Sequence, residues 1–220
     1  MKRFLLILGL ALVHTITFAQ NYGYGDKTIT FGIAGGSSSA GFYTKAPEQL
    51  YVDANVATPI SAGINADFKF NDFFSIRPGI FYQGKGGTIN ETANYVVDEE
   101  YRLHYFEIPV DFIGHLPIGQ EGANLFLGGG PYASIGLNGT CRNTESDVPT
   151  TQKIKFGSNG DFKSTDFGAT MLLGFQTAGG TAIGVNFELG FTNILQKSDL
   201  NIGATSARTG VFYLSLGQSF

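Results

Sequence analysis

Charged side chains are scarce in this sequence, and several of them interrupt apolar segments at alternate positions. Asp67 and Lys69 stand in one such segment, Arg77 in the next, and Glu107 and Asp111 in a third. Paired carboxylates can perform acid–base chemistry, but Glu107 and Asp111 are four residues apart, which in a strand separates them by roughly 13 Å. That distance is too large for direct cooperation. We therefore interpret these residues as a charge network and not as a catalytic pair.

The histidines and the single cysteine suggest no metal or disulfide chemistry. His104 and His115 are expected at opposite ends of one strand, and His14 stands in the N-terminal segment. His104 would face outward near one rim, where a partner serine would suggest a lipid-modifying enzyme, but the sequence places no serine or carboxylate convincingly beside it. Cys141 has no second cysteine to pair with and is interpreted as an incidental loop residue. We assign no catalytic residue, no metal ligand and no cofactor.

The elements that position these charges have a period of two. In 60–70 the even positions are apolar and the odd positions are small or polar, a pattern that predicts a half-buried strand and that no helical period produces. Seven further segments alternate in the same way: 28–34, 74–83, 106–112, 124–137, 166–176, 183–191 and 212–220. Each approaches the length of about ten residues with which a tilted strand crosses a bilayer. The prediction is an all-β, eight-stranded, antiparallel up-and-down barrel.

Alternation alone does not decide which face points outward, because a soluble lipocalin-like barrel has its apolar face inside. Three features favour a transmembrane barrel of the outer-membrane type. Short and long connections alternate, as in such barrels. The charged face would be costly in the dry pocket of a soluble barrel. The chain also ends on Phe220, and a final aromatic residue resembles the signal that the outer-membrane assembly machinery reads. The long connections are expected at 37–59, 84–101, 138–162 and 195–208.

The first residues predict export. Lys2 and Arg3 precede an apolar run of about ten residues, which matches a secretory signal and is too short to cross a membrane as a helix. Small residues around the expected cleavage site predict a mature chain that begins at Gln20. We therefore divide the chain into a signal peptide at 1–19 and an outer-membrane β-barrel domain at 20–220.

Charge and composition exclude some partners. Loss of the two positive charges of the signal changes the formal net charge from −4 to −6. Nucleic acid is therefore not an expected partner, because phosphate binding of that kind needs a basic patch. The glycine run at 128–130 lacks the lysine and the helix of a phosphate-binding loop, so it predicts a kink or bulge in a strand.

Two neighbouring segments, 60–70 and 74–83, form the first predicted hairpin. Both keep their apolar residues on even positions, so matching faces require an odd number of loop residues. A three-residue loop at 71–73 meets this condition and pairs Phe70 with Phe74.

That register sets Asp67 directly opposite Arg77 on the inner face, and Asp111 on the following strand is expected at a similar depth near the periplasmic end. The predicted role is structural, since charges that pair with one another can fill a narrow barrel; transport or gating is the alternative. The full lumen charge network is expected to comprise Asp67, Arg77, Asp111, Lys69, Glu107 and Glu188.

Four stretches of the sequence resemble one known family, the PorT-like outer-membrane β-barrel domain family of the Bacteroidota. The stretches are FKFNDFFSIRPGIFYQGKGG (68–87), YFEIPVDF (105–112), LFLGGGPYASIGL (125–137) and FELGFTNI (187–194). The resemblance spans nearly the whole mature chain and combines hairpin patterning with EIP and GGPY motifs. It implies an eight-stranded barrel in the outer membrane of a Gram-negative bacterium. PorT itself is linked to the type IX secretion system, and the resemblance brings no catalytic residues with it.

We expect a non-enzymatic outer-membrane protein with a structural, envelope-integrity or partner-docking role, secretion-associated in the manner of PorT. Expected contacts are outer-membrane lipid and lipopolysaccharide, the assembly machinery and an envelope protein partner. An acidic run at 98–100 could bind divalent cations that bridge lipopolysaccharide, but a solvated charge run is the preferred interpretation. The alternatives are a small-solute channel, for which eight strands leave little room, a lipid-modifying outer-membrane enzyme, and a soluble periplasmic lipocalin-like binder.

Overall fold

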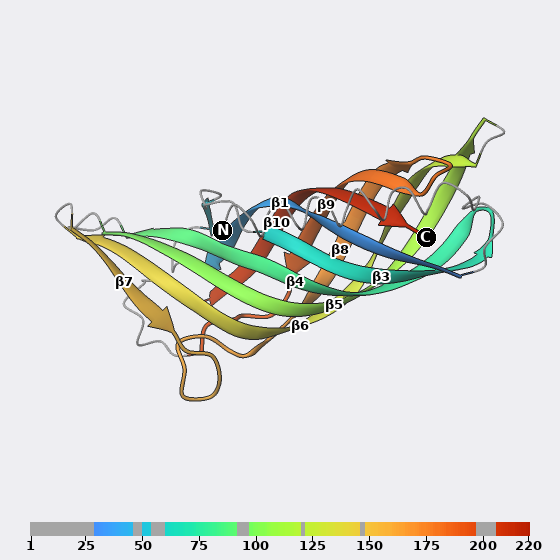
Figure 1. Cartoon of the computed structure of the whole chain (residues 1–220). Coiled ribbons are helices and arrows are strands. Elements are labelled where there is room, and N and C mark those ends of the chain that lie inside the picture. Colours follow the sequence, from blue (N-terminus) through green and yellow to red (C-terminus); the bar gives the residue numbers. More distant parts are fainter. Residues whose placement is uncertain are drawn as a thin grey trace, which may run out of the picture.

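The computed structural model describes residues 29–45, 50–53, 60–91, 97–119, 122–145, 148–196 and 206–220, so the signal peptide predicted at 1–19 lies outside the described residues. The described strands form one antiparallel sheet that closes on itself through the pairing of β10 with β1 (Figure 1). The predicted eight-stranded up-and-down barrel is confirmed. Its ring consists of β1 (Ile29–Lys45), β3 (Ile60–Asn71), β4 (Phe74–Glu91), β5 (Val97–Ile118), β6 (Ala123–Glu145), β8 (Thr165–Gln176), β9 (Thr181–Gly190) and β10 (Ser206–Ser219).

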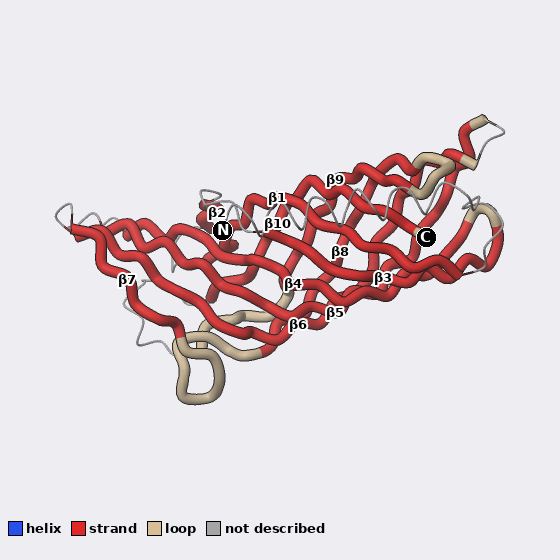
Figure 2. The backbone as a smooth tube through the Cα atoms, in the orientation of Figure 1, coloured by secondary structure: helices blue, strands red, loops and turns tan. Residues whose placement is uncertain are grey.

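Two further strands stand outside the ring and were not predicted. β2 (Leu50–Asp53) pairs with β1, and β7 (Val148–Ile154) pairs with β6. Together with the long ends of β4, β5 and β6 they carry the sheet beyond the ring at one end, as Figure 2 shows. Much of the sequence predicted as long loops is therefore strand, because the hydrogen-bonded ladders of β4 with β5 and of β5 with β6 continue outward to Glu91 and Thr144.

The short turns lie at the opposite end of the barrel. Those between β3 and β4, β5 and β6, and β8 and β9 gather at the right of Figure 1, where the C-terminus also lies. Outer-membrane barrels have short turns on the periplasmic side and longer segments outside. We therefore call this the periplasmic end and the other the outer end. Among the described residues no helix is long and apolar enough to cross a membrane.

The apolar face of the sheet points outward. Phe31, Leu127 and Leu216 are each more than 60 % exposed, and many other large apolar side chains along the ring are exposed with them. The inward positions carry polar and charged side chains that are almost fully buried. This arrangement is the reverse of a lipocalin-like barrel and is the one that a lipid surround requires.

The first hairpin differs from its prediction in one detail. The turn has two residues, Asp72 and Phe73, and Phe74 pairs with Asn71 instead of Phe70. A register shift between Lys69 and Asn71 adds one unpaired residue on the β3 side. A two-residue turn and a one-residue bulge have the same effect on register as a three-residue loop. Below the bulge the predicted register is therefore unchanged, with Phe68 opposite Ile76 and Asn65 opposite Gly79.

Glycines bring backbones close together at several points of the ring. Of the kink or bulge predicted at 128–130, the bulge is wrong, since β6 keeps its register with β8 through these residues. A Cβ on Gly130 would instead lie 1.9 Å from the Val110 carbonyl oxygen, so the missing side chain permits close approach of β5. At the closing seam, a Cβ on Gly36 would lie 1.7 Å from the Leu214 carbonyl oxygen.

Gly36→Val should prevent closure of the β1–β10 seam, because no shift of a flexible side chain can relieve a clash with backbone. A closed barrel resists unfolding by cold SDS and migrates faster unboiled than boiled. The variant should lose this fast form in detergent-extracted membranes, whereas Ser37→Val, at the exposed neighbouring position, should keep it. Fast migration of Gly36→Val would contradict the seam geometry.

Candidate functional site

The middle of the lumen is organised around Lys85. Its side chain projects from β4 and is fully buried, with Nζ 2.7 Å from Oε2 of Glu107, 3.2 Å from Oδ2 of Asp166 and 3.7 Å from Oε2 of Glu188. The three carboxylates come from β5, β8 and β9, so one ammonium group connects strands on different sides of the ring. We call these four residues the Lys85 cluster.

Aromatic and hydroxyl groups complete the surroundings of this ammonium. Nζ lies 3.9 Å from the centre of the Tyr132 ring and 5.4 Å from that of Tyr105, distances at which a cation is attracted to the ring face. Asp166 Oδ2 also accepts hydrogen bonds from the hydroxyl groups of Tyr132, at 3.1 Å, and Thr209, at 2.9 Å. Buried ions are tolerated when they are paired and hydrogen-bonded in this manner.

A second charged group lies nearer the periplasmic end. Arg77 donates from Nη2 and Nε to Oδ2 of Asp67, at 2.6 and 3.2 Å. Asp111 stands opposite Arg77 in the register of β4 with β5 and accepts a hydrogen bond from the Thr170 hydroxyl. A cavity of about 80 Å³, which has room for several water molecules, is lined by both groups of charges and continues to Gln176 and Gln218 nearer the periplasmic end. The lumen thus holds two groups of charges and a small wet space.

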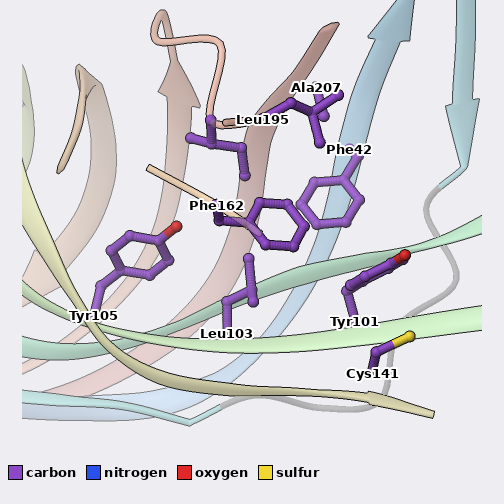
Figure 3. Packing of buried hydrophobic residues seen from close by; sticks show 9 residues of the cluster. Phe42, Tyr101, Leu103, Tyr105, Cys141, Phe162, Leu195 and Ala207 are labelled. Carbon is purple, nitrogen blue, oxygen red and sulfur yellow. The ribbon is translucent and has the colours of Figure 1, made fainter. Parts of the chain in front are cut away.

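The outer end of the lumen is closed by an apolar plug, which we define as the cluster around Phe162 shown in Figure 3. Phe162 belongs to the segment between β7 and β8, and its ring centre lies 5.5 Å from that of Tyr101 and 6.4 Å from that of Phe42. An isolated bridge to Leu195 holds the segment in place. The other members of the plug are Leu103, Tyr105, Cys141, Ile194 and Ala207.

Three polar side chains at the periplasmic end form a hydrogen-bonded chain across β4, β5 and β6. The Ser75 Oγ atom lies 2.8 Å from Nε2 of His115, and Nδ1 of His115 lies 3.1 Å from Oδ1 of Asn124. The order of hydroxyl, imidazole and amide is that of a nucleophile, a base and an orienting group. All three residues are buried, however, and Ser75 is 0 % exposed. Within the described ranges no set of His, Cys, Asp and Glu side chains is spaced to hold a metal ion.

Comparison with known proteins decides the family. Residues 18–196 match a family model described as outer membrane protein beta-barrel domain. The chain belongs to this family. Membership places the barrel in the outer membrane, in agreement with the outward apolar face. The chain has no match among the curated proteins.

Solved outer-membrane proteins are similar at low identity. The attachment invasion locus protein Ail of Yersinia pestis is 13 % identical with a TM-score of 0.46, over 88 % of this chain and 100 % of that chain. The outer membrane protein OprG of Pseudomonas aeruginosa is 13 % identical with a TM-score of 0.44, over 89 % of this chain and 98 % of its own. At this level of similarity we carry nothing over from these proteins.

In this outer-membrane barrel the residues predicted as a single charge network separate into two groups. Asp67, Arg77 and Asp111 lie together on β3, β4 and β5, whereas Glu107 and Glu188 surround Lys85 farther out. The two remaining members of the predicted site stand at the periplasmic end. Lys69 pairs in register with Ser75, and the Phe220 N–H donates to the Phe31 carbonyl, at 2.8 Å.

Sequence reasoning missed the central residue of the lumen. The alternation of β4 continues from Gln83 to Lys85, but the glycines around Lys85 made 84–101 resemble a loop.

The prediction for Cys141 was also wrong. This residue lies in β6 and not in a loop, and it packs in the plug, where burial raises the pKa of its thiol to about 11. The thiol is therefore protonated at neutral pH and unsuited to act as a nucleophile.

Lys85→Met should destabilise the barrel strongly, because it leaves three buried carboxylates without their cation. Removal of one partner from a buried ion pair costs about 3–5 kcal/mol. Urea unfolding in detergent, followed by the fraction that migrates fast on cold gels, should register a loss of this size. Lys155→Met, at an exposed lysine, should change the free energy of unfolding by less than about 0.5 kcal/mol. Equal stability of the two variants would show that Lys85 is not central.

Proposed function

We propose that this chain is a closed, non-enzymatic barrel that serves the outer membrane as a structural element and as a docking platform for an envelope partner. The observation that carries the proposal is the filled lumen. The plug occupies its outer end, and the Lys85 cluster occupies its middle with a side chain that is 0 % exposed. A solute would have to displace both, and the second step would separate buried ions that cost several kcal/mol to leave unpaired.

If the lumen is closed, the function must depend on the surfaces at the ends of the barrel. The sheet of β5, β6 and β7 continues beyond the ring at the outer end and offers a hydrogen-bonded platform there. We also propose, from the EIP and GGPY motifs, that the chain is a PorT-like protein of the Bacteroidota. It would be exported by a cleaved signal peptide at 1–19 and be associated with secretion. The proposed contacts are lipopolysaccharide, the assembly machinery that would read Phe220, and an envelope protein.

Planar-bilayer recordings test the closed lumen. The refolded protein should give no conductance steps in potassium chloride, while a wide porin reconstituted in the same way should give them. Reproducible conductance steps that require the protein would support the channel alternative.

In cells, loss of the protein should increase uptake of an apolar fluorescent dye across the outer membrane, and expression of the wild-type protein should restore the barrier. An unchanged barrier would count against the envelope-integrity role.

The Ser75–His115–Asn124 chain is the observation that favours an enzyme as the second candidate. A serine hydrolase activates its serine through a neighbouring histidine, and these two groups lie at hydrogen-bond distance. Its serine must also be reached by a substrate. Ser75 is fully buried, and the lumen cavity is lined by other residues. We therefore interpret the three hydrogen-bonded side chains as a polar layer that closes the periplasmic end of the lumen.

A fluorophosphonate probe, which labels activated serines covalently, distinguishes the two interpretations. The folded protein should remain unlabelled, and Ser75→Ala should restore the envelope barrier as well as the wild-type chain does. Labelling that disappears in both Ser75→Ala and His115→Ala, while the fast-migrating folded form is retained, would establish a reactive serine and overturn the non-enzymatic proposal.

A further inference from the structure

Three cationic side chains share one outward-facing surface of the sheet near the outer end. Arg102, Arg142 and Lys153 are all exposed and come from β5, β6 and β7. In the register, Arg102 stands opposite Thr140, and Thr140 stands opposite Lys153. Residues in one such row point to the same side of a sheet, and Arg142 follows Thr140 by two residues. We call Arg102, Arg142 and Lys153 the basic face.

A bulge creates this face. Tyr105 pairs with Gly136, but the next residue outward, His104, pairs with Asn138, so β6 has one extra residue at this point. An extra residue reverses which positions of the strand face outward. Beyond the bulge, Cys141 therefore points into the plug, and Arg142 points out.

The position along β5 sets the basic face at the level of lipid headgroups. The exposed apolar side chains of β5 extend from Ile118 to Phe106. Twelve residue steps at about 3.3 Å give roughly 40 Å along the strand. At the usual tilt of barrel strands this corresponds to about 30 Å across the membrane, close to the thickness of the hydrocarbon core of a bilayer. His104 and Arg102 are the next two outward positions, just beyond the apolar band.

The charges among the described side chains of this surface are mainly positive. Among its described side chains the acid is Glu100, which accepts a hydrogen bond from Nε of Arg102, at 2.9 Å, and stands opposite Arg142 in the register. That bond uses Nε and leaves the terminal amino groups of Arg102 for another acceptor. A carboxylate beside two arginines orients them without neutralising the whole face.

His104 adds a polar ring at the border with the apolar band. Its ring stacks on that of Tyr82, with centres 5.5 Å apart, and Nδ1 lies 2.7 Å from the Tyr82 hydroxyl. The tautomer of His104 decides which of these two groups donates the hydrogen bond. Asn138, exposed beside His104 on β6, supplies an amide group.

We propose that the basic face binds the phosphate groups of a lipid in the outer leaflet, with phosphorylated glycolipid as the ligand class. Guanidinium and ammonium groups bind phosphate through charge-assisted hydrogen bonds. The apolar band begins directly below, at Phe106 and Leu137, so a lipid can place its acyl chains there while its phosphate meets the cations. A free anion would gain nothing from that neighbouring surface. The proposal depends on the outer-membrane location and not on the closed lumen.

Native mass spectrometry of the detergent-solubilised full chain tests the proposal with purified diphosphorylated lipid A as the probe. The wild-type protein should retain this lipid and retain its dephosphorylated form at least tenfold less well. A cation at a membrane surface contributes about fivefold to binding, so Arg102→Gln combined with Lys153→Gln should weaken retention about 25-fold. Arg208→Gln, at an exposed arginine on β10, should leave retention unchanged.

Each variant is first checked for the fast-migrating folded form. Lys153→Gln alone, expected to weaken retention about fivefold, provides the test if the double variant does not fold. Equal retention of both lipid forms, or equal losses in Arg208→Gln and the double variant, would overturn the proposal. Displacement of the lipid by an equal concentration of inorganic phosphate would show a free-anion site and would also overturn it. Resistance to that competitor supports the lipid.

Discussion

The contact between Lys85 and its three carboxylates is the constraint on which the rest of this barrel depends. Eight strands enclose a narrow lumen, and ions placed there lose their water. One ammonium group, held on β4, compensates this loss for carboxylates on β5, β8 and β9, so it fixes how far apart these strands can lie. The plug packs on the outer side of this level, and the Asp67–Arg77 pair lies on the periplasmic side.

What the sequence predicts well is what a strand determines locally. Alternation defines a strand and its two faces within a few residues, so all eight ring strands were found. It also fixes register by parity, which is why the β3–β4 hairpin has the predicted alignment at Phe68 although its turn is shorter than expected. The missing loop residue became the bulge between Lys69 and Asn71. The apolar faces of both strands must point outward, and this requirement fixes whether the number of residues between two paired positions is odd or even. It does not fix the detailed shape of the turn.

Contacts across the ring could not be predicted in the same way. Alternation states that Glu107, Asp166 and Glu188 face inward, but it does not state which of them meet one cation from another strand. Lys85 was lost because glycines flank it, and glycine in a strand resembles a loop. The bulge at Leu137 had a similar effect. It broke the pattern of β6, so a continuous strand that turns Cys141 inward was interpreted as the start of a loop.

The separation of charge between the two faces of the sheet links these features. The chain has a net negative charge, yet its outer rim presents a basic face. This is possible because many carboxylates are held inside the ring, where Lys85 and Arg77 partly neutralise them and the sheet separates them from the lipid. The same alternation that hides the acids exposes the apolar band, and one bulge above that band turns a cation of β6 toward the headgroups. A barrel can thus fill its lumen with negative charge and still attract an anionic membrane surface.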